Sequence, residues 1–431
     1  MVSITKSVVI STFGSLGDVF PYVAVAKELM ERGVKVAIAT TGDYQEMLAQ
    51  HGVQSLEIGN RMRPMLEADP DFGRKLMDQA TGPQFVLQEL VMRPLRPRYE
   101  QLLAATEGVD LIVTHTLAYH AILVARTRGI PFVSTILSPL NFWSKYDPPA
   151  MNKILWLPKM RRVWGATISG AILKRISDDV YSWGEPYREL QRQLGMEVDT
   201  RNVFFEGQYS PVKNLGLFSP VFGPSQADWP PNAVATGFPF LEQEEEIPED
   251  VREKVRDFLQ AGEAPVVVTL GSSAVWDAGN FYVDSVEALS SCGLRGLLLV
   301  GKELQKNIPS KLPDSVIAVE YLPHSLIFRH ARAIVHQGGV GTTAQALRSG
   351  NPQLVMPYSH DQFDNAQRVE RLGCGLWMEK KNYNARSAGN LLRRLCSGAF
   401  RARAEEIGKQ ISAENGAAKA AEEIIQVLTK R

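Results

Sequence analysis

VHQGGVGTTAQALRSGNPQLVMPYSHDQFDNAQRV, residues 335–369, is the stretch that decides the fold. Three of its first seven residues are glycines, which follow an apolar, strand-like run and precede residues 342–347, a run typical of a helix. Glycine permits positive φ and lets main-chain N–H groups approach a ligand closely. Because a helix N-terminus favours negative charge, the pattern predicts an anion-binding turn between a strand and a helix. The glycines are Gly338, Gly339 and Gly341.

The second part of the stretch indicates what kind of anion is bound. Pro357 ends another apolar run, and Asp361 and Gln362 follow it closely. A carboxylate beside an amide can form hydrogen bonds with both the donors and the acceptors of a polyol's hydroxyl groups. Phosphate at one end and hydroxyls at the other describe a nucleotide-sugar. The spacing matches neither GxxxxGK[ST] nor GxGxxG, which disfavours a nicotinamide oxidoreductase.

Length and composition restrict the class of protein. The chain has 431 residues, enough for two domains of about 200 residues each. Lys and Arg balance Asp and Glu at 47 each, so charge does not favour nucleic acid as a partner. Three cysteines without a CxxC pair indicate reduced thiols. With neither a signal peptide nor a long apolar segment evident, we expect a cytoplasmic protein, a monomer or weak dimer.

Strand-like and helix-like runs alternate along both halves of the chain, which predicts an α/β fold with parallel sheets. In the first half, a strand over 7–11, a loop over 12–18 and a helix over 21–31 begin the alternation. A proline-rich, acidic stretch then reads as a linker between domains. The predicted parts are an N-terminal domain 1–222, a linker 223–247, a C-terminal domain 248–412 and a final helix 413–431.

A family resemblance rests on the residues of the opening stretch. They resemble the donor signature HxGGxGT…GxP…P…DQxxNA of inverting nucleotide-sugar glycosyltransferases with the GT-B fold, and look closest to bacterial enzymes acting on lipids, sterols, macrolides, glycopeptides and polyphenols. The resemblance implies two Rossmann-like domains facing across a cleft, with the donor on the second and the acceptor on the first, and no metal. The matching residues are His336, Gly338, Gly339, Gly341, Thr342, Gly350, Pro352, Pro357, Asp361, Gln362, Asn365 and Ala366.

The catalytic base is expected in the first loop, FGSLGDVFP. The family places a His or Asp three residues before a proline there, and Asp18 occupies that position before Pro21. A carboxylate can take the proton of an attacking hydroxyl, but Asp18 could instead cap the helix. His115 stands where the family often has the acid partner, so the two residue types are exchanged, and which one takes the proton is open. His120 is a competing candidate.

The expected donor site extends beyond the glycine turn. Tyr321 would stack on uracil or thymine, and Gln345 stands where many members carry a Glu for the ribose. This exchange of Gln for Glu weakens a preference for UDP over dTDP. UDP-glucose is the favoured donor because the family's acid–amide pair, here Asp361 and Gln362, is seen with glucose donors, and a dTDP-deoxysugar of the rhamnosyl type is the alternative. Fixed donors at the diphosphate would stabilise the leaving group without metal. The predicted donor-binding residues are Ser272, Ser273, Tyr321, Leu322, His324, His336, Gly338, Gly339, Val340, Gly341, Thr342, Gln345, Asp361 and Gln362.

The acceptor is less well defined. Residues 138–195 mix tryptophans with Lys and Arg, which suits an amphipathic helical pair packed on the sheet, an acceptor channel or, over 151–176, a peripheral membrane contact. We expect a hydrophobic or aromatic acceptor with a hydroxyl group. Asp69 and Asp71 form a DxD by chance, since Pro70 makes a poor Mg²⁺ site. A non-catalytic, nucleotide-sugar-binding helper protein is the rival interpretation. The predicted acceptor-binding residues are Phe13, His120, Phe142, Trp143 and Tyr146.

Overall fold

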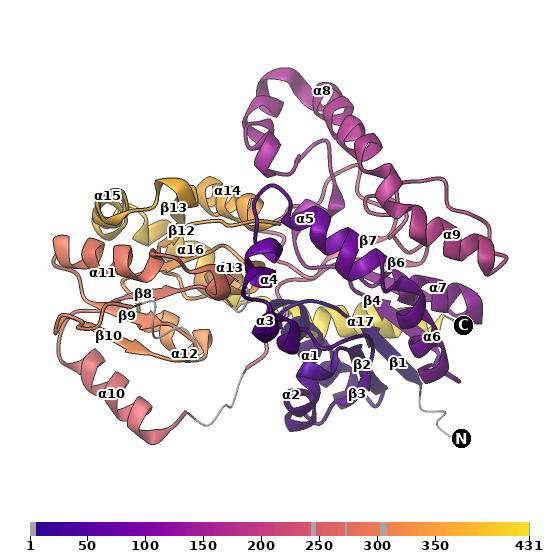
Figure 1. Cartoon of the computed structure of the whole chain (residues 1–431), viewed down its shortest axis with the longest axis horizontal. Helices are drawn as coiled ribbons and strands as arrows, with labels where there is room; N and C mark the ends of the chain where they lie inside the picture. The colour runs from indigo at the N-terminus through magenta and orange to yellow at the C-terminus, as the bar shows by residue number, and fades with distance from the viewer. Residues whose placement is uncertain (1–5, 243–246, 272–273, 302–307, 431) are drawn as a thin grey trace. The chain divides into compact units, whose positions relative to one another are not determined.

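The computed structural model describes residues 6–242, 247–271, 274–301 and 308–430 (Figure 1). The chain forms two compact units. The first contains the chain up to residue 76, residues 80–241 and the chain from 414 onward. The second contains residues 77–79 and 242–413.

A parallel sheet of seven strands, in the order β3-β2-β1-β4-β5-β6-β7, forms the centre of the first unit. The central strands are buried on both faces, as expected for apolar runs in a parallel sheet. β1 lies between β2 and β4, with Ser11 paired to both Ala39 and Thr114. The strands are β1 (Ser7–Ser11), β2 (Lys35–Thr40), β3 (Gln54–Glu57), β4 (Leu111–Thr114), β5 (Phe132–Ile136), β6 (Lys213–Gly216) and β7 (Ala233–Ala235).

Helices connect these strands and supply most of the apolar core around them. They are α1 (Leu16–Glu31), α2 (Gln45–Gln50), α3 (Arg63–Ala68), α4 (Pro70–Leu76), α5 (Gly82–Phe85), α6 (Leu95–Ala105), α7 (Tyr119–Arg128), α8 (Leu157–Asp179) and α9 (Glu185–Gln193), with a π-helical turn at Val86–Met92.

The second unit repeats the design with a parallel sheet of six strands, in the order β10-β9-β8-β11-β12-β13. Its strands are β8 (Val266–Thr269), β9 (Gly296–Leu299), β10 (Val316–Val319), β11 (Ala333–His336), β12 (Gln353–Val355) and β13 (Gly375–Trp377). Its helices are α10 (Glu249–Gln260), α11 (Phe281–Ser291), α12 (His324–Ile327), α13 (Val340–Arg348), α14 (Gln362–Leu372), α15 (Ala385–Cys396) and α16 (Arg401–Ser412). The predicted α/β class with two parallel sheets is confirmed.

The last helix, α17 (Gly416–Thr429), packs against α1 and β6 of the first unit. Its start is close to the turn at Gly237, where a Cβ on Gly416 would lie 2.4 Å from the Gly237 carbonyl group. Farther along, the Lys213 Nζ is 2.7 Å from Glu423 Oε2, with both side chains largely buried. Close backbone packing and a buried ion pair therefore attach the end of the chain to the first sheet.

The structure corrects two expectations about helices. The first helix begins at Leu16 rather than Pro21, because Ser15 and Asp18 cap it one turn earlier, and Pro21 lies inside it. The predicted helical pair within residues 138–195, formed by α8 and α9, is packed only in part. Tyr187 and Leu190 of α9 belong to the core of the first unit, whereas in α8 only Leu157, Ser169 and Leu173 are buried. Among the helices of the described residues, none has the length and apolar character needed to cross a membrane.

Candidate functional site

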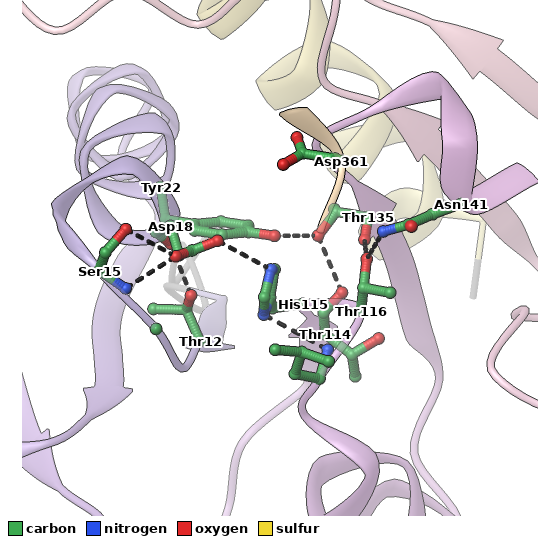
Figure 2. Close-up of polar contacts among 12 residues, drawn as sticks. Thr12, Ser15, Asp18, Tyr22, Thr114, His115, Thr116, Thr135, Asn141 and Asp361 are labelled. Carbon is green, nitrogen blue, oxygen red and sulfur yellow. Dashed lines mark hydrogen bonds and ion pairs between the residues drawn. The ribbon is translucent and has the colours of Figure 1, made fainter. Parts of the chain in front are cut away.

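Asp18 lies in the first turn of α1, directly beyond the carboxyl end of β1 (Figure 2). Its Oδ2 accepts hydrogen bonds from the Ser15 main-chain N–H at 2.7 Å and from Ser15 Oγ at 3.0 Å. The Thr12 hydroxyl donates to the main-chain carbonyl of Asp18 at 2.6 Å. One carboxylate oxygen is thus held in place by the helix cap, while the other, Oδ1, is directed toward His115. The capping alternative and the catalytic one are therefore compatible.

Gly14 makes room for this carboxylate. Its φ is +140°, a conformation that L-residues with side chains rarely adopt, and a Cβ there would lie 2.3 Å from Asp18 Oδ2. The Gly14 carbonyl accepts a hydrogen bond from the Tyr44 hydroxyl at 2.8 Å, which holds the loop from the other side. Glycine is needed at this position because a side chain would displace the Asp18 carboxylate.

His115 follows β4, the neighbour of β1, and its main-chain N–H donates to the Ser11 carbonyl. Its Nδ1 accepts the Leu117 N–H at 3.3 Å, so the ring proton resides on Nε2, which lies 3.6 Å from Asp18 Oδ1. Burial lowers the pKa of His115, and the nearby Asp18 charge only partly opposes this shift. The His115 side chain is 5% exposed and that of Asp18 is 31% exposed. A neutral imidazole thus supports the more accessible carboxylate.

A network of hydroxyl groups surrounds the pair (Figure 2). Tyr22 and Thr135 share a hydrogen bond of 2.6 Å, and Thr135 donates to the Thr114 carbonyl at 2.8 Å. The Tyr22 ring meets the His115 ring edge-on, with centroids 6.0 Å apart. Sequence reasoning missed Ser15 and Tyr22; the Ser15-x-x-Asp18 capping-box pattern could have identified the first, but no local signal marks the second.

The residues predicted to bind the acceptor lie mostly in the core of the first unit. His120 is buried, with Nε2 3.1 Å from Ser11 Oγ. Phe13 is buried beneath the Arg98 guanidinium, and the buried Phe142 ring stacks on Trp229 with centroids 4.0 Å apart. This packing favours a structural role for these three, because neighbouring residues cover their side chains almost completely. Trp143, at positive φ, stacks on Phe205, and Tyr146 is half-buried.

In the second unit, the glycine turn connects β11 to α13. Gly338 has a φ of +90°, and a Cβ there would lie 2.7 Å from the Val355 side chain. Its carbonyl accepts a hydrogen bond from Asn365 Nδ2 at 2.9 Å. Gly339 is the N-cap, so the N–H groups of the next residues, Val340, Gly341 and Thr342, have no carbonyl partner within α13. Such a helix start can hold an anion.

His336 shapes this turn from inside. Its Nδ1 accepts the Gly338 N–H at 3.0 Å and its Nε2 lies 2.9 Å from Gln353 Oε1. The ring is fully buried, and burial lowers its pKa to about 4, although the bond to Gln353 opposes the shift. Both ring nitrogens therefore have partners inside the protein. This arrangement supports an indirect role through the turn rather than the direct diphosphate contact that we expected.

Asp361 and Gln362 have different positions at the start of α14. Gln362 is buried and its Oε1 accepts the Tyr358 N–H at 2.8 Å, so it holds the loop before the helix. Asp361 is half-buried at the N-cap, and its Oδ2 accepts a hydrogen bond from Asn365 Nδ2 at 2.8 Å. Asn365 thus links the loop carboxylate to the Gly338 turn. Of the two predicted sugar-binding side chains, Asp361 is the more accessible.

The remaining donor-site candidates differ in exposure. Tyr321, before α12, is 44% exposed and presents ring surface suitable for stacking, whereas Leu322 is buried. The His324 ring lies flat on Phe328, with centroids 4.4 Å apart. Gln345 is half-buried on α13. Ser272 and Ser273 lie outside the described residues.

The Asp69-Pro70-Asp71 segment is engaged in local contacts. Asp69 Oδ2 lies 3.2 Å from Lys75 Nζ, and Asp71 pairs with Arg74 at 3.0 Å. Within the described ranges, no group of three or more His, Cys, Asp or Glu side chains is arranged to hold a metal ion.

Two family models match separate parts of the chain. Residues 8–139 match the glycosyltransferase family 28 N-terminal domain. Residues 297–430 match the erythromycin biosynthesis protein CIII-like C-terminal domain. Each match contains one of the two polar clusters described above, the first around Asp18 and the second around Gly338.

Curated relatives include sterol 3-beta-glucosyltransferases of fungi. That of Debaryomyces hansenii is 26% identical over 432 residues, covering 96% of this chain and 26% of the relative. That of Yarrowia lipolytica is 28% identical over 437 residues, covering 97% of this chain and 28% of the relative. The chain thus spans little more than a quarter of the length of these relatives.

Solved structures with the same fold include glycosyltransferases of natural products. The calicheamicin glycosyltransferase CalG4 has a TM-score of 0.71 at 17% identity, and the match covers 99% of this chain and 98% of the CalG4 chain. The glycosyltransferase VinC, in complex with dTDP, has a TM-score of 0.69 at 20% identity, and the match covers 99% of this chain and 100% of the VinC chain. The spinosyn rhamnosyltransferase SpnG has a TM-score of 0.69 at 19% identity, with coverage of 99% and 100%.

Proposed function

We propose that this chain, which belongs to the GT-B glycosyltransferases with family 28 and erythromycin CIII-like domains, transfers a hexose to a small-molecule hydroxyl. The single observation that supports this most strongly is the Asp18 carboxylate. One of its oxygens is fixed by Ser15, and the other is directed to the neutral imidazole of His115. That arrangement orients a base and keeps it accessible, as general-base catalysis requires.

The proposed reaction is a direct displacement that inverts the anomeric carbon. Asp18 takes the proton of the acceptor hydroxyl as its oxygen forms a bond to C1 of the sugar. The bond between C1 and the diphosphate oxygen breaks at the same time, and its electron pair leaves with the diphosphate. His115 acts as a positioning residue, because its Nε2–H supports the carboxylate while burial keeps the ring neutral. Asp18 is thus the proton acceptor of the two.

The donor is proposed to be UDP-glucose, held by the second unit. The N–H groups at the start of α13, which have no carbonyl partner within that helix, would bind the diphosphate. Tyr321 would stack on the nucleobase, and Asp361 would accept hydrogen bonds from the sugar hydroxyls. The names of the fungal relatives support glucose as the sugar. A dTDP-deoxysugar is the alternative donor, supported by two solved structures of this fold, VinC in complex with dTDP and the rhamnosyltransferase SpnG.

The acceptor is proposed to be a hydrophobic small molecule with a hydroxyl group, such as a sterol or a polyketide. The fungal relatives act on sterols according to their names, and this chain matches them over nearly its whole length. Since Phe13 and Phe142 are packed inside the first unit, other side chains are needed to contact the acceptor. The hydroxyl-bearing residues near Asp18, such as Thr116, are suitable candidates.

The test is a matrix of UDP-glucose, dTDP-glucose and dTDP-rhamnose against sterol, macrolide and polyphenol acceptors, with products detected by mass. We expect one donor and acceptor combination to give a glycoside of inverted anomeric configuration by NMR. Asp18→Asn should lower turnover by about 10²–10⁴-fold, while UDP should still raise its thermal midpoint. Glu31→Gln, an exposed carboxylate change on the same helix, should leave turnover unchanged.

Three results would contradict the proposal or part of it. A product with retained configuration would exclude direct displacement. A second outcome is that nucleotide-sugars raise the thermal midpoint while no donor and acceptor combination gives transfer or hydrolysis. That result would support a non-catalytic helper protein. Full activity of Asp18→Asn would reject the assigned base.

A further inference from the structure

An apolar surface on α8 has no part in the proposed reaction. It consists of the exposed side chains of Trp156, at the N-cap, and of Val163 and Trp164, and we call it the α8 patch. Ile168, beyond the break in the helix, is exposed as well. Val163 is 74% exposed, which is unusual for a side chain whose burial is favourable. The Trp156 and Trp164 rings contact each other edge-on, with centroids 5.6 Å apart. Figure 1 shows α8 as the bent magenta helix that extends away from the sheet of the first unit.

The bend in α8 arises from its sequence. Gly165 has φ 78° and ψ 174°, which interrupts the helix directly after Trp164. Nothing among the described residues would contact a Cβ at this position, so packing does not require the glycine. The break separates a short segment that bears Val163 and Trp164 from the longer segment that returns to the body of the unit.

The sequence that carries the α8 patch is positively charged. Between Pro148 and Ser177 the sequence contains no Asp or Glu. Lys159 lies three residues after Trp156 and four before Val163, on the same side of the helix. In contrast, Lys174 and Arg175, near the other end of α8, pair with Asp178 and Asp179. The bases near the patch, which have no carboxylate partner in the described part of the chain, are Lys153, Lys159, Arg161 and Arg162.

We propose that the α8 patch docks the protein peripherally on an anionic lipid bilayer. Tryptophan favours the interface between headgroups and acyl chains, and exposed aliphatic side chains enter the acyl region. Lys and Arg side chains extend from such a surface toward anionic headgroups. The unpaired bases thus complement lipid phosphates, whereas a second copy would bring like charges together. The helix lies on the membrane rather than crossing it, because it lacks the apolar length to span one.

Vesicle co-sedimentation of the full chain tests the proposal. We compare phosphatidylcholine vesicles with vesicles that also contain phosphatidylglycerol. The wild type should bind the anionic vesicles more tightly, and salt should weaken that binding. Lys159→Gln/Arg162→Gln should lower the partition constant by about fivefold per cation. Val163→Asp should lower binding to both kinds of vesicle at least about tenfold, because it removes apolar area from the docking surface.

Matched controls distinguish docking from general charge and hydrophobicity. Lys27→Gln/Lys35→Gln removes the same charge from exposed sites in the first unit, and Val212→Asp changes another exposed valine. Both should bind vesicles like the wild type, and all variants should keep the wild-type thermal midpoint. Equal losses in the controls, or no binding by the wild type, would overturn the proposal. If the wild type forms dimers without lipid and Val163→Asp is a monomer, the α8 patch is a self-association surface instead. Glycosyl transfer is not needed for any of these measurements.

Discussion

At the scale of single residues, the geometry around Asp18 depends on what its neighbours lack as much as on what they supply. Gly14 has no side chain where one would overlap the carboxylate, and Ser15 supplies two donors to the same oxygen. The result is a carboxylate whose position is determined before any substrate binds. Such preorganisation favours catalysis because no reorientation is needed during the reaction.

Substituting two glycines near Asp18, one in the loop and one in the first turn of α1, tests this preorganisation. Gly14→Ala should lower turnover by about 100-fold and stability by about 1–3 kcal/mol, because the new Cβ overlaps Asp18 Oδ2 at an unfavourable φ. Gly17→Ala should be tolerated, since its Cβ would meet only Ser15 Oγ at 3.5 Å. Turnover and urea unfolding measure both effects. Equal behaviour of the two variants would contradict the argument.

The positioning role of His115 is tested by a pair of substitutions. His115→Ala removes the Nε2–H that faces Asp18 and should lower kcat by about 10–100-fold, with the KM for the donor unchanged. His115→Gln can place an amide N–H near the same position and should restore part of the loss. Steady-state kinetics separate kcat from KM. Identical rates for the Ala and Gln variants would argue against support through this N–H.

At the scale of elements, α17 carries the end of the chain onto the first unit. Burial alone would raise the pKa of Glu423, but its bonds to Lys213 and Lys419 outweigh burial and lower it. A carboxyl group with a lowered folded-state pKa stabilises the fold above its unfolded pKa. That stabilisation is lost as the pH falls through the folded-state value. The attachment of α17 should therefore weaken in acid.

Glu423→Gln tests the attachment. At pH 7 it should lower the free energy of unfolding by about 1–3 kcal/mol, because it removes a buried charged hydrogen bond to Lys213. As the pH falls below the ordinary glutamate pKa of about 4.3 toward the lowered folded-state pKa, the wild type loses the same interaction, so the difference should shrink and then close. Glu422→Gln, at an exposed neighbour, should change stability by less than about 0.5 kcal/mol. Urea unfolding at neutral pH and at a series of acidic pH values provides the comparison.

At the scale of the whole molecule, each unit contains a histidine that is buried neutral. Burial lowers the pKa of His120 to about 3 and that of His336 to about 4. Between these values and the ordinary histidine pKa of about 6.5, the unfolded chain binds protons that the folded protein does not. Stability must therefore rise with pH across this window and be lost as the pH falls.

The expected loss is about 2 kcal/mol for each of these histidines at pH 5. His120→Gln cannot titrate and keeps a polar partner for Ser11, so it should remove about 2 kcal/mol of the decline between pH 7 and pH 5. Unfolding of wild type and variant at several pH values measures this difference. An unchanged pH profile would show that His120 titrates normally in the folded protein.

The sequence by itself determined the local features of this protein. Alternating apolar runs predicted two parallel sheets, because strand and helix periodicity are local properties. The glycine turn at Gly338 was likewise visible, since positive φ and close packing require a residue without a side chain. The family resemblance drawn from that turn is confirmed, whereas the roles of the individual site residues remain predictions.

Tertiary structure alone decided which distant residues meet and which side chains face water. Asp18 and His115 approach each other only because β1 and β4 are neighbours in the sheet. The sequence predicted Phe142 and His120 as acceptor contacts, but packing buries both side chains. Trp164 and Val163 are exposed. The physical reason is that burial depends on which elements cover a residue, and that strand order brings together segments far apart in the chain. No local pattern of sequence encodes either property.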